Sequence, residues 1–243
     1  MKHLELYEAF THHITIGIDI DGTISNFTEA YNTLFKRTFP NNEINADATD
    51  WFWYQKMNYD GADPNKWMKE KKAETFDLAI PFPDAVNTIN NIYDFIKTHG
   101  HTLNIVTNQI TPEAKEKAKE WLDKYGFKFD DVIFVDMAKD KWKYVDIMVD
   151  DAPKVADSKP LSKVCIKPEQ PWNQNSSGDF NLPKIKDLTI DIIQRAIAKL
   201  KKTVDALEGS MAGFGENVLI ATPSFAKIYK AEPPKIDKVE RIQ

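Results

Sequence analysis

Length, composition and charge limit the classes of protein to which this chain can belong. Its 243 residues, 42% of them apolar and 28% charged, suit one sizeable core with an insertion, or at most two domains. A net charge of -5 disfavours an extended nucleic-acid surface, and the single Cys165 excludes a disulfide framework or a cysteine zinc site. No apolar run approaches the ~18 residues of a membrane span and no signal peptide is visible, so we expect a cytoplasmic protein without a membrane partner.

Short β-branched strands alternate with amphipathic helices along the chain. The strands are predicted at residues 14–19, 103–107, 132–135, 145–149 and 164–166. A helix is predicted after the second strand, because Thr111 can cap it, Pro112 suits its first turn and Gly126 suits its end. This alternation is typical of α/β proteins, so we predict a Rossmann-like parallel sheet wrapped by helices.

Residues 20–102 separate the first two predicted strands, far more than one crossover helix needs. We therefore predict a small helical cap at residues 25–81, inserted after the first strand. The core is then formed by residues 1–24 and 82–207. A strongly amphipathic helix is predicted at about residues 187–208, where it can pack on the sheet or form the contact of a homodimer. For the C-terminal tail at residues 208–243 the sequence predicts no role.

The first predicted strand ends in two carboxylates, Asp19 and Asp21, which are followed by Gly22 and Thr23. Residues two apart on a strand point to the same side, so Asp19 and Asp21 can converge where open α/β sheets bind their ligands. Two close carboxylates repel each other and usually require a cation or a shared proton. The alternative is a plain turn, since Asp and Gly are ordinary turn residues.

The predicted cap is unusually rich in aromatic residues, which gather at Trp51, Phe52 and Trp53. They can form the cap's own small core, or a flat apolar slot on which a nucleobase stacks. Both arrangements can hold together, because alternate residues face opposite ways. Phe27 and Trp53 are the first candidates for contact with a base, followed by Trp51 and Phe52.

The Asp-x-Asp-Gly-Thr sequence at residues 19–23, after an apolar strand, resembles the first motif of the haloacid dehalogenase-like phosphohydrolases. Three further marks of that family are a Ser or Thr that ends the second strand, a Lys, and an acidic pair after another apolar strand. The chain has these marks, in this order, at Thr107, Lys141, Asp150 and Asp151. The resemblance extends over roughly residues 14–168 and implies the same fold with a helical cap.

Within that superfamily, the chain is most similar to the 5'(3')-deoxyribonucleotidases. Phe27 lies eight residues after Asp19, where that family places an aromatic ring against the base. The Pro-Phe-Pro-Asp-Ala sequence at residues 81–85 resembles the family's Pro-x-Pro-Gly-Ala entry to a helix. The spacing of residues 146–150 resembles the approach to its acidic pair.

The chain departs from the family's pattern at two places. Asp84 stands where Gly is usual in the helix entry. The interval from Lys141 to Asp150 is one residue shorter than in the family, which leaves Lys139 and Lys143 as alternatives for the lysine role.

The resemblance implies a role for each candidate catalytic residue. Asp19 is expected to be the nucleophile that forms an aspartyl-phosphate, and Asp21 the general acid that later becomes the base. Thr107 is expected to donate a hydrogen bond to a phosphoryl oxygen, although a β-branched residue is also ordinary in a strand. Apart from the resemblance, Asn108 can add an amide donor beside it. Lys141 is expected to place a positive charge between the nucleophile and the phosphate.

The resemblance also implies a bound Mg²⁺, which prefers hard oxygen ligands. Asp19, Asp150 and the backbone carbonyl of Asp21 are its expected ligands. Asp151 and Asp146 are candidates for a supporting role around them.

These features together predict a Mg²⁺-dependent phosphatase of nucleoside monophosphates, with deoxyribonucleotides as expected substrates. One alternative is a small-metabolite or sugar-phosphate phosphatase of the same superfamily, although sugars alone would favour a more polar cap. An alternative of another class is a binding or assembly module that kept the fold and lost turnover. The complete set of Asp19, Asp21, Lys141 and Asp150 argues against that module.

Overall fold

The chain divides into two compact units, one of residues 13–203 and one of residues 1–12 with 204–243. The structure, a computed structural model, describes residues 13–44, 49–206, 210–214 and 218–222. The larger unit holds a six-stranded sheet. The described part of the smaller unit holds an antiparallel hairpin of β7 (Ser210–Phe214) and β8 (Val218–Thr222). This hairpin was not predicted, and the rest of the predicted tail lies outside the described residues.

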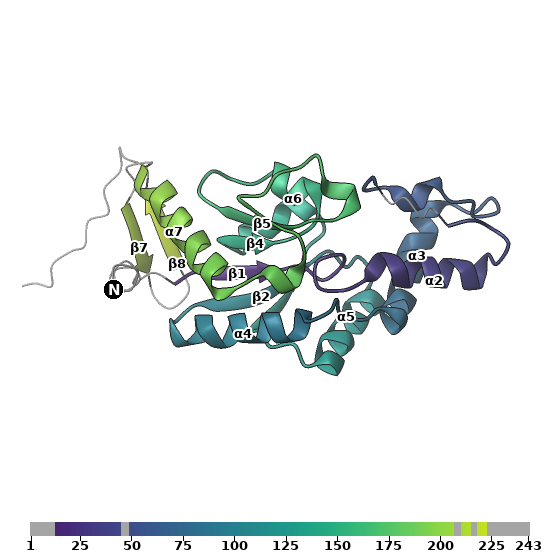
Figure 1. The fold of residues 1–243 in the computed structure, drawn as a ribbon, viewed down its shortest axis with the longest axis horizontal. Helices are drawn as coiled ribbons and strands as arrows, with labels where there is room; N and C mark the ends of the chain where they lie inside the picture. Colours follow the sequence, from purple (N-terminus) through teal and green to yellow (C-terminus); the bar gives the residue numbers. More distant parts are fainter. Residues whose placement is uncertain (1–12, 45–48, 207–209, 215–217, 223–243) are drawn as a thin grey trace, which may run out of the picture. The chain divides into compact units, whose positions relative to one another are not determined.

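The six strands of the large sheet are all parallel, as predicted (Figure 1). They are β1 (Thr15–Ile18), β2 (Thr102–Thr107), β3 (Asp131–Phe134), β4 (Ile147–Val149), β5 (Val164–Pro168) and β6 (Phe180–Leu182). The inner strands are buried on both faces, which explains why they read as continuous β-branched runs. The short strand β6 was missed, because only one of its three residues is buried.

The strand order is β3-β2-β1-β4-β5-β6, so the chain winds away from β1 in one direction and then from β4 in the other. Open α/β sheets bind their ligands in the crevice at the carboxyl ends of the two strands where this winding reverses. Asp19 directly follows β1 and Asp150 directly follows β4. Asp19 N donates to Val149 O at 3.0 Å, which extends the pairing of the two strands up to these carboxylates.

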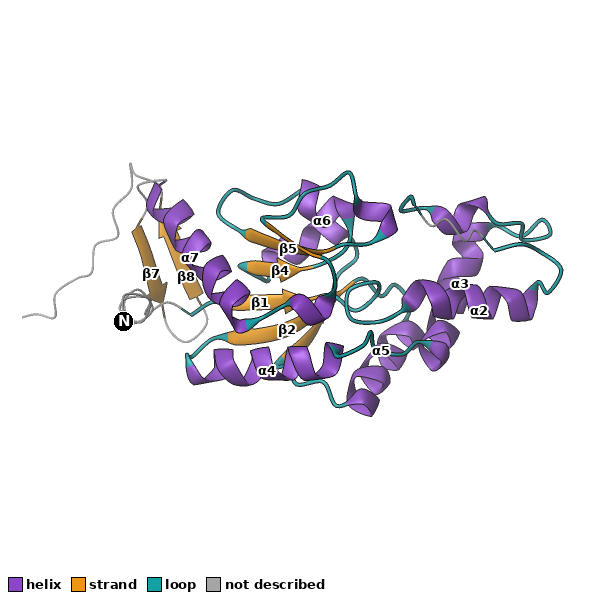
Figure 2. Ribbon diagram, in the orientation of Figure 1, coloured by secondary structure: helices purple, strands orange, loops and turns teal. Residues whose placement is uncertain are grey.

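Helices connect the strands, and several of them pack against the sheet (Figure 2). Those of the larger unit's described residues are α2 (Phe27–Thr38), η1 (Trp53–Lys56), α3 (Pro64–Leu78), α4 (Ala85–Thr98), α5 (Pro112–Tyr125), η2 (Ala138–Lys143), α6 (Pro153–Asp157), η3 (Pro171–Asn173), η4 (Ile185–Asp187) and α7 (Ile190–Ala206), whose last residues belong to the smaller unit. Within the described part of the chain, none of the helices has the length and apolar character that a membrane crossing requires. The parallel sheet and the helices that connect its strands confirm the fold class predicted for the chain.

Local capping explains where α4 and α5 begin and end. The Thr111 hydroxyl accepts from Ala114 N at 3.1 Å and Gly126 ends α5 at φ 71°, as the sequence predicted. Asp84 precedes α4 at φ 63°, in the left-handed region that favours glycine. This backbone conformation accounts for the glycine that the resembling family carries at the same place. The helix predicted at 187–208 begins later, at Ile190, because η4 occupies the preceding turn.

Residues between β1 and α4 form a helical insertion of α2, η1 and α3, which lies beyond the carboxyl ends of the strands (Figure 1). Its two ends are tied together, because Asn26 N donates to Ile80 O at 3.0 Å and Phe82 N donates to Ile24 O at 2.9 Å. The insertion has a hydrophobic cluster of its own, made of Phe27, Tyr31, Leu34, Phe35, Trp53, Met57, Tyr59 and Trp67. Most of its aromatic residues therefore stabilise the insertion itself.

Replacing the residue that caps α5 tests this account of the fold. Thr111→Ala is expected to lower the free energy of unfolding by about 1 kcal/mol, because the N–H of Ala114 loses its acceptor. The measurement is urea unfolding followed by circular dichroism. Thr33→Ala is the control, since Thr33 lies inside α2, where alanine is the better helix former. An equal loss in both variants would contradict the capping role of Thr111.

Candidate active site

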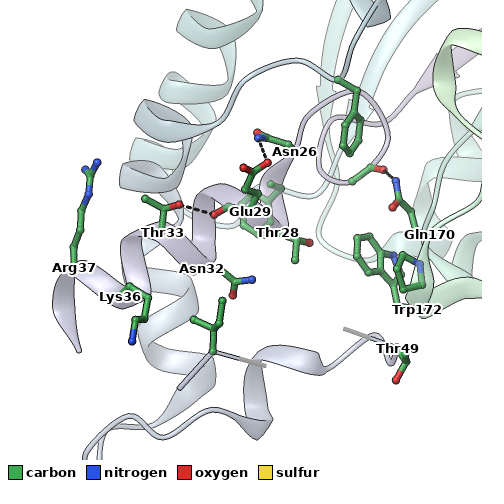
Figure 3. Close-up of a pocket in the computed structure, with 15 residues that line it drawn as sticks. Asn26, Thr28, Glu29, Asn32, Thr33, Lys36, Arg37, Thr49, Gln170 and Trp172 are labelled. Carbon is green, nitrogen blue, oxygen red and sulfur yellow. Dashed lines mark hydrogen bonds between the residues drawn. The ribbon is translucent and has the colours of Figure 1, made fainter. Parts of the chain in front are cut away.

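Two neighbouring cavities border the loop after β1 and the insertion. The first, of about 930 Å³, is lined by all the residues predicted for catalysis or substrate binding, namely Asp19, Asp21, Phe27, Trp51, Phe52, Trp53, Thr107, Asn108 and Lys141. The second, of about 830 Å³, lies between α2 and the segment of Trp172 (Figure 3), and of that set only Phe27 lines it. The first cavity is therefore the candidate active site.

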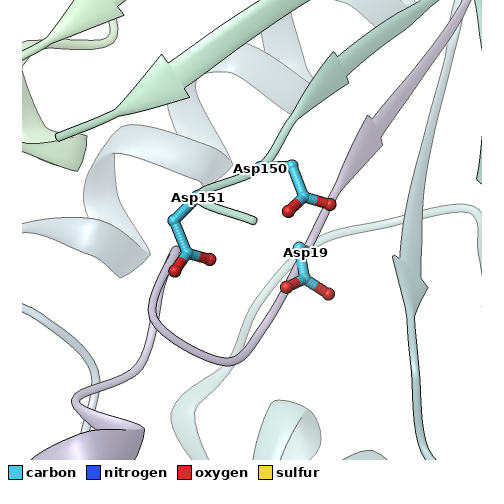
Figure 4. Close-up of side chains that lie close together, drawn as sticks. All are labelled: Asp19, Asp150 and Asp151. Atoms are coloured by element: carbon cyan, nitrogen blue, oxygen red, sulfur yellow. The ribbon is translucent and has the colours of Figure 1, made fainter. Parts of the chain in front are cut away.

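Three carboxylates meet beside this cavity (Figure 4). Oxygen atoms of Asp19, Asp150 and Asp151 lie within 4.8 Å of one another, and all three side chains are buried. Asp19 and Asp150 were both predicted as metal ligands, and the adjacency of β1 and β4 brings them together. The side chain of Asp21 lies outside this group, so its predicted metal contact through the backbone carbonyl is left as a proposal.

Lys141 of η2 is the cation of this carboxylate group. Its Nζ lies 2.8 Å from Asp19 Oδ1 and 2.6 Å from Asp150 Oδ2, and its side chain is buried. Burial alone disfavours the ammonium, but the charges of Asp150 and Asp19 outweigh it and raise the pKa of Lys141 above its ordinary value. Lys139 and Lys143 are both exposed, and Lys139 also lines the cavity. Of the three lysines left open by the sequence, Lys141 is the one that pairs with Asp19 and Asp150.

One lysine does not compensate the charge of three buried carboxylates. Burial raises the pKa of Asp150, Asp19 adds to this by repulsion, and Lys141 opposes it. Burial, and then the charges of Asp150 and Asp19, also raise the pKa of Asp151 well above its ordinary value. The group thus favours a further positive charge, and its oxygen ligands fit a hard divalent cation.

Asp151 is held in place by the residues of the first motif. The Thr23 hydroxyl donates to Asp151 Oδ1 at 2.9 Å and accepts from Asp151 N at 3.1 Å. Gly22 has φ 75°, and a Cβ there would lie 2.5 Å from Asp151 Oδ2. The Gly-Thr sequence that follows Asp21 is therefore required by the close approach of Asp151, and the motif is more than a turn.

A loop after β5 supports the same carboxylate from the other side, although no role was predicted for this loop. Trp172 Nε1 donates to Asp151 Oδ2 at 2.7 Å, and Asn173 Nδ2 donates to Asp151 O at 2.8 Å. The buried Lys167 anchors this loop, because its Nζ donates to Asn173 O at 2.8 Å and to Ser176 O at 2.9 Å. The one sequence signal for this support was a tryptophan inside an otherwise polar stretch.

Asp21 has a separate environment on the cavity wall. Its Oδ2 lies 3.0 Å from Lys72 Nζ and accepts from Gln109 Nε2 at 2.9 Å. The same amide lies 3.3 Å from the Thr107 hydroxyl, which is buried at the end of β2. Lys72 and Gln109 were not among the predicted site residues, since nothing in their local sequence distinguishes them from other polar residues.

The predicted aromatic residues were expected to form either the core of the insertion or a surface on which a base stacks, and both are found. Trp53 is 5% exposed and packs edge-on against Tyr31, with 5.2 Å between ring centroids, so it belongs to the core of the insertion as well as to the cavity wall. Trp51 and Phe52 are 37% and 45% exposed on the same cavity. Exposed aromatic faces at a cavity are typical of a stacking surface.

Removal of Lys141 tests how the carboxylate group is stabilised. Lys141→Met is expected to lower the free energy of unfolding by about 3 kcal/mol or more without divalent cations, because it leaves Asp19 and Asp150 buried and unpaired. Urea titration at neutral pH measures this. Lys139→Met and Lys143→Met remove exposed ammonium groups and should each cost less than about 1 kcal/mol. If Lys141→Met lowers the free energy of unfolding by no more than these two variants do, the Lys141 ammonium does not compensate the charge of the carboxylates.

Comparison with known proteins identifies the family and the fold. The family model described as 5' nucleotidase, deoxy (pyrimidine), cytosolic type C protein (NT5C) matches residues 12–195. A comparison with curated protein sequences found no match.

Several solved structures share the fold. One is a haloacid dehalogenase-like family hydrolase from Streptococcus pneumoniae, with 16% identity over 75% of this chain and 98% of that one, at a TM-score of 0.53. Another is the HAD-hydrolase YfnB from Bacillus subtilis, with 16% identity over 73% and 97% and a TM-score of 0.52. A third, from Burkholderia xenovorans, has 14% identity over 76% and 99% and a TM-score of 0.50. Because the NT5C model covers well over half of the chain, this protein belongs to that family of 5' nucleotidases and is a phosphoric monoester hydrolase.

Proposed function

We propose that this protein is a Mg²⁺-dependent phosphatase that hydrolyses nucleoside monophosphates, with deoxyribonucleotides as preferred substrates. One observation carries the proposal: a single cavity holds Asp19, Asp21 and Lys141 together with the exposed aromatic side chains of the insertion. The description of the matching family, a deoxy 5' nucleotidase of cytosolic type, supports both the substrate class and a cytoplasmic location. The homodimer stays a prediction.

The proposed reaction consists of two displacements at phosphorus. In the first, a carboxylate oxygen of Asp19 attacks the phosphorus and the bond to the ester oxygen breaks, while Asp21 transfers a proton to that oxygen. In the second, Asp21 takes a proton from a water molecule as the water oxygen attacks the phosphorus. Inorganic phosphate leaves and the Asp19 carboxylate is restored. Lys141, 2.8 Å from Asp19, lowers the repulsion between the carboxylate and the incoming anionic phosphate.

The proposed metal ligands are Asp19, Asp150 and the backbone carbonyl of Asp21, with Asp151 as a fourth oxygen ligand or as a support. The donor set fits Mg²⁺, because it consists of carboxylates that carry more negative charge than Lys141 offsets. When bound, Mg²⁺ supplies positive charge that draws the phosphate to the nucleophile. The solved structure of YfnB from Bacillus subtilis was determined bound to magnesium, which supports this choice of metal.

The rest of the cavity suits the other parts of a nucleotide. Thr107 ends β2 on the cavity wall, where its hydroxyl would donate to a phosphoryl oxygen. Asn108 would add a donor beside it, although its Nδ2 already donates to Val135 O at 2.9 Å. We propose that residues 25–81 act as a cap, on which Trp51 and Phe52 stack against the base.

The nucleophile assignment is tested by Asp19→Asn, which is expected to reduce kcat by at least about a thousandfold because an amide cannot form the acyl phosphate. Phosphate release with Mg²⁺ is measured on deoxyribonucleoside and ribonucleoside 5'- and 3'-monophosphates and on sugar phosphates. Asp136→Asn, an exposed carboxylate on the same cavity, is the control and should keep its activity. Unimpaired turnover in Asp19→Asn would exclude Asp19 as the nucleophile. Sugar phosphates that react faster than every nucleotide would contradict the substrate class.

The stacking assignment is tested by Trp51→Ala and Phe52→Ala. Stacking on an aromatic ring contributes about 1–3 kcal/mol per base, so each variant is expected to raise the KM for deoxynucleotides several-fold. The KM for 2-deoxyribose 5-phosphate, which has no base, should not change. Tyr144→Ala is the control, because Tyr144 is exposed and lies off the cavity. An equal rise in KM for both substrates would show that these rings do not recognise the base.

A further inference from the structure

The two carboxylate oxygens of Asp21 have unequal surroundings. Oδ2 accepts from Gln109 Nε2 at 2.9 Å and lies 3.0 Å from Lys72 Nζ. Oδ1 is buried and has no hydrogen-bond partner among the described residues. Among the described residues, the Asp21 carboxylate is therefore held through Oδ2, by Gln109 and Lys72.

Lys72 is fixed at this place by several groups at once. Besides Asp21, its Nζ donates to Asn108 O at 3.1 Å and lies 5.3 Å from the centroid of the Phe27 ring. The Lys72 and Asp21 side chains are each only 17% exposed, so water screens their interaction weakly. A lysine side chain loses much rotamer freedom when it is held in this way, which several simultaneous contacts can offset.

Lys72 also belongs to a different part of the fold from Asp21. It lies on α3 of the insertion, whereas Asp21 lies on the loop after β1. The helix α3 packs against α5, and Trp121 Nε1 of α5 donates to Ala79 O, which ends α3, at 2.9 Å. The packing of α3 against α5 therefore brings the Lys72 ammonium to Asp21.

We propose that Lys72 is a positioning residue for Asp21: together with Gln109 it holds the carboxylate on the cavity wall, in the place from which Asp21 gives the proton to the leaving group. The assignment rests on the proposed role of Asp21 as general acid. Lys72 can hold Asp21 only while α3 is packed against α5, so proton transfer by Asp21 depends on the position of the insertion. Lys141 compensates the carboxylate group on the nucleophile side, so the two lysines serve different steps.

The leaving group distinguishes this role from phosphate binding. A nucleoside or sugar alkoxide needs a proton as its bond to phosphorus breaks, whereas 4-nitrophenolate leaves as a stable anion. If Lys72 positions the acid, its loss should slow the first kind of substrate and largely spare the second. If Lys72 binds the phosphate, both should slow alike.

The experiment compares the wild type with Lys72→Met, Lys72→Arg and the control Lys66→Met in the full chain with Mg²⁺. Lys66 lies on the same helix but is exposed, 3.8 Å from Glu70. Release of the leaving group is followed in a single turnover, with the enzyme in excess, for 4-nitrophenyl phosphate and for the alkyl phosphomonoester that the wild type hydrolyses fastest. The KM of that ester is measured alongside.

Lys72→Met is expected to slow release of the alcohol by about tenfold to a hundredfold, a part of the 10²–10⁴ that general acids contribute, with little change in KM. It should slow 4-nitrophenolate by less than about threefold, and Lys72→Arg should restore most of the loss because it keeps a cationic donor. Lys66→Met should match the wild type.

Equal slowing of both substrates, or no slowing of either, overturns the positioning role. A wild type inert toward every phosphomonoester instead overturns the proposed function, while preference for a sugar phosphate overturns only its substrate class and still permits this test.

Discussion

The site depends on one buried ion pair network, in which the Lys141 ammonium lies between the carboxylates of Asp19 and Asp150. The reversal of winding between β1 and β4 places these two carboxylates side by side, where they would otherwise repel each other. Lys141 reduces this repulsion without removing it, because Asp151 adds a third buried charge. The remaining negative charge makes the crevice suitable for a divalent cation and, with it, for an anionic phosphate.

A second set of contacts keeps the acidic group rigid and joins it to the insertion. Thr23 and Trp172 both donate to Asp151, so its two carboxylate oxygens have fixed directions. The ring of Trp172 also packs against the hydrophobic cluster of the insertion. In the same cavity, Lys72 of α3 reaches Asp21. The insertion thus contacts Asp21 directly and Asp151 through Trp172, and so supplies more than an aromatic surface.

Much of the fold could be predicted because its signals are local. The buried strands appear as β-branched runs, and Thr111 and Gly126 mark the ends of α5 through hydrogen bonds and backbone angles of their own segment. The strand β6 and the hairpin of β7 and β8 were missed. β6 is short and only one of its residues is buried, so its pattern is weak.

The sequence by itself determined that Asp19, Thr107 and Asp150 stand at the ends of parallel strands, because strand periodicity and the family motifs are properties of the chain read in order. Only the tertiary structure decided that Lys141 reaches the carboxylates while its neighbouring lysines stay exposed. Only the tertiary structure also shows that Lys72 pairs with Asp21, which lies far from it in the sequence. The physical reason is that a lysine run or a polar helix face has no local preference for one partner. The partner is selected by the packing of α3 and η2 against the sheet, which no short segment encodes.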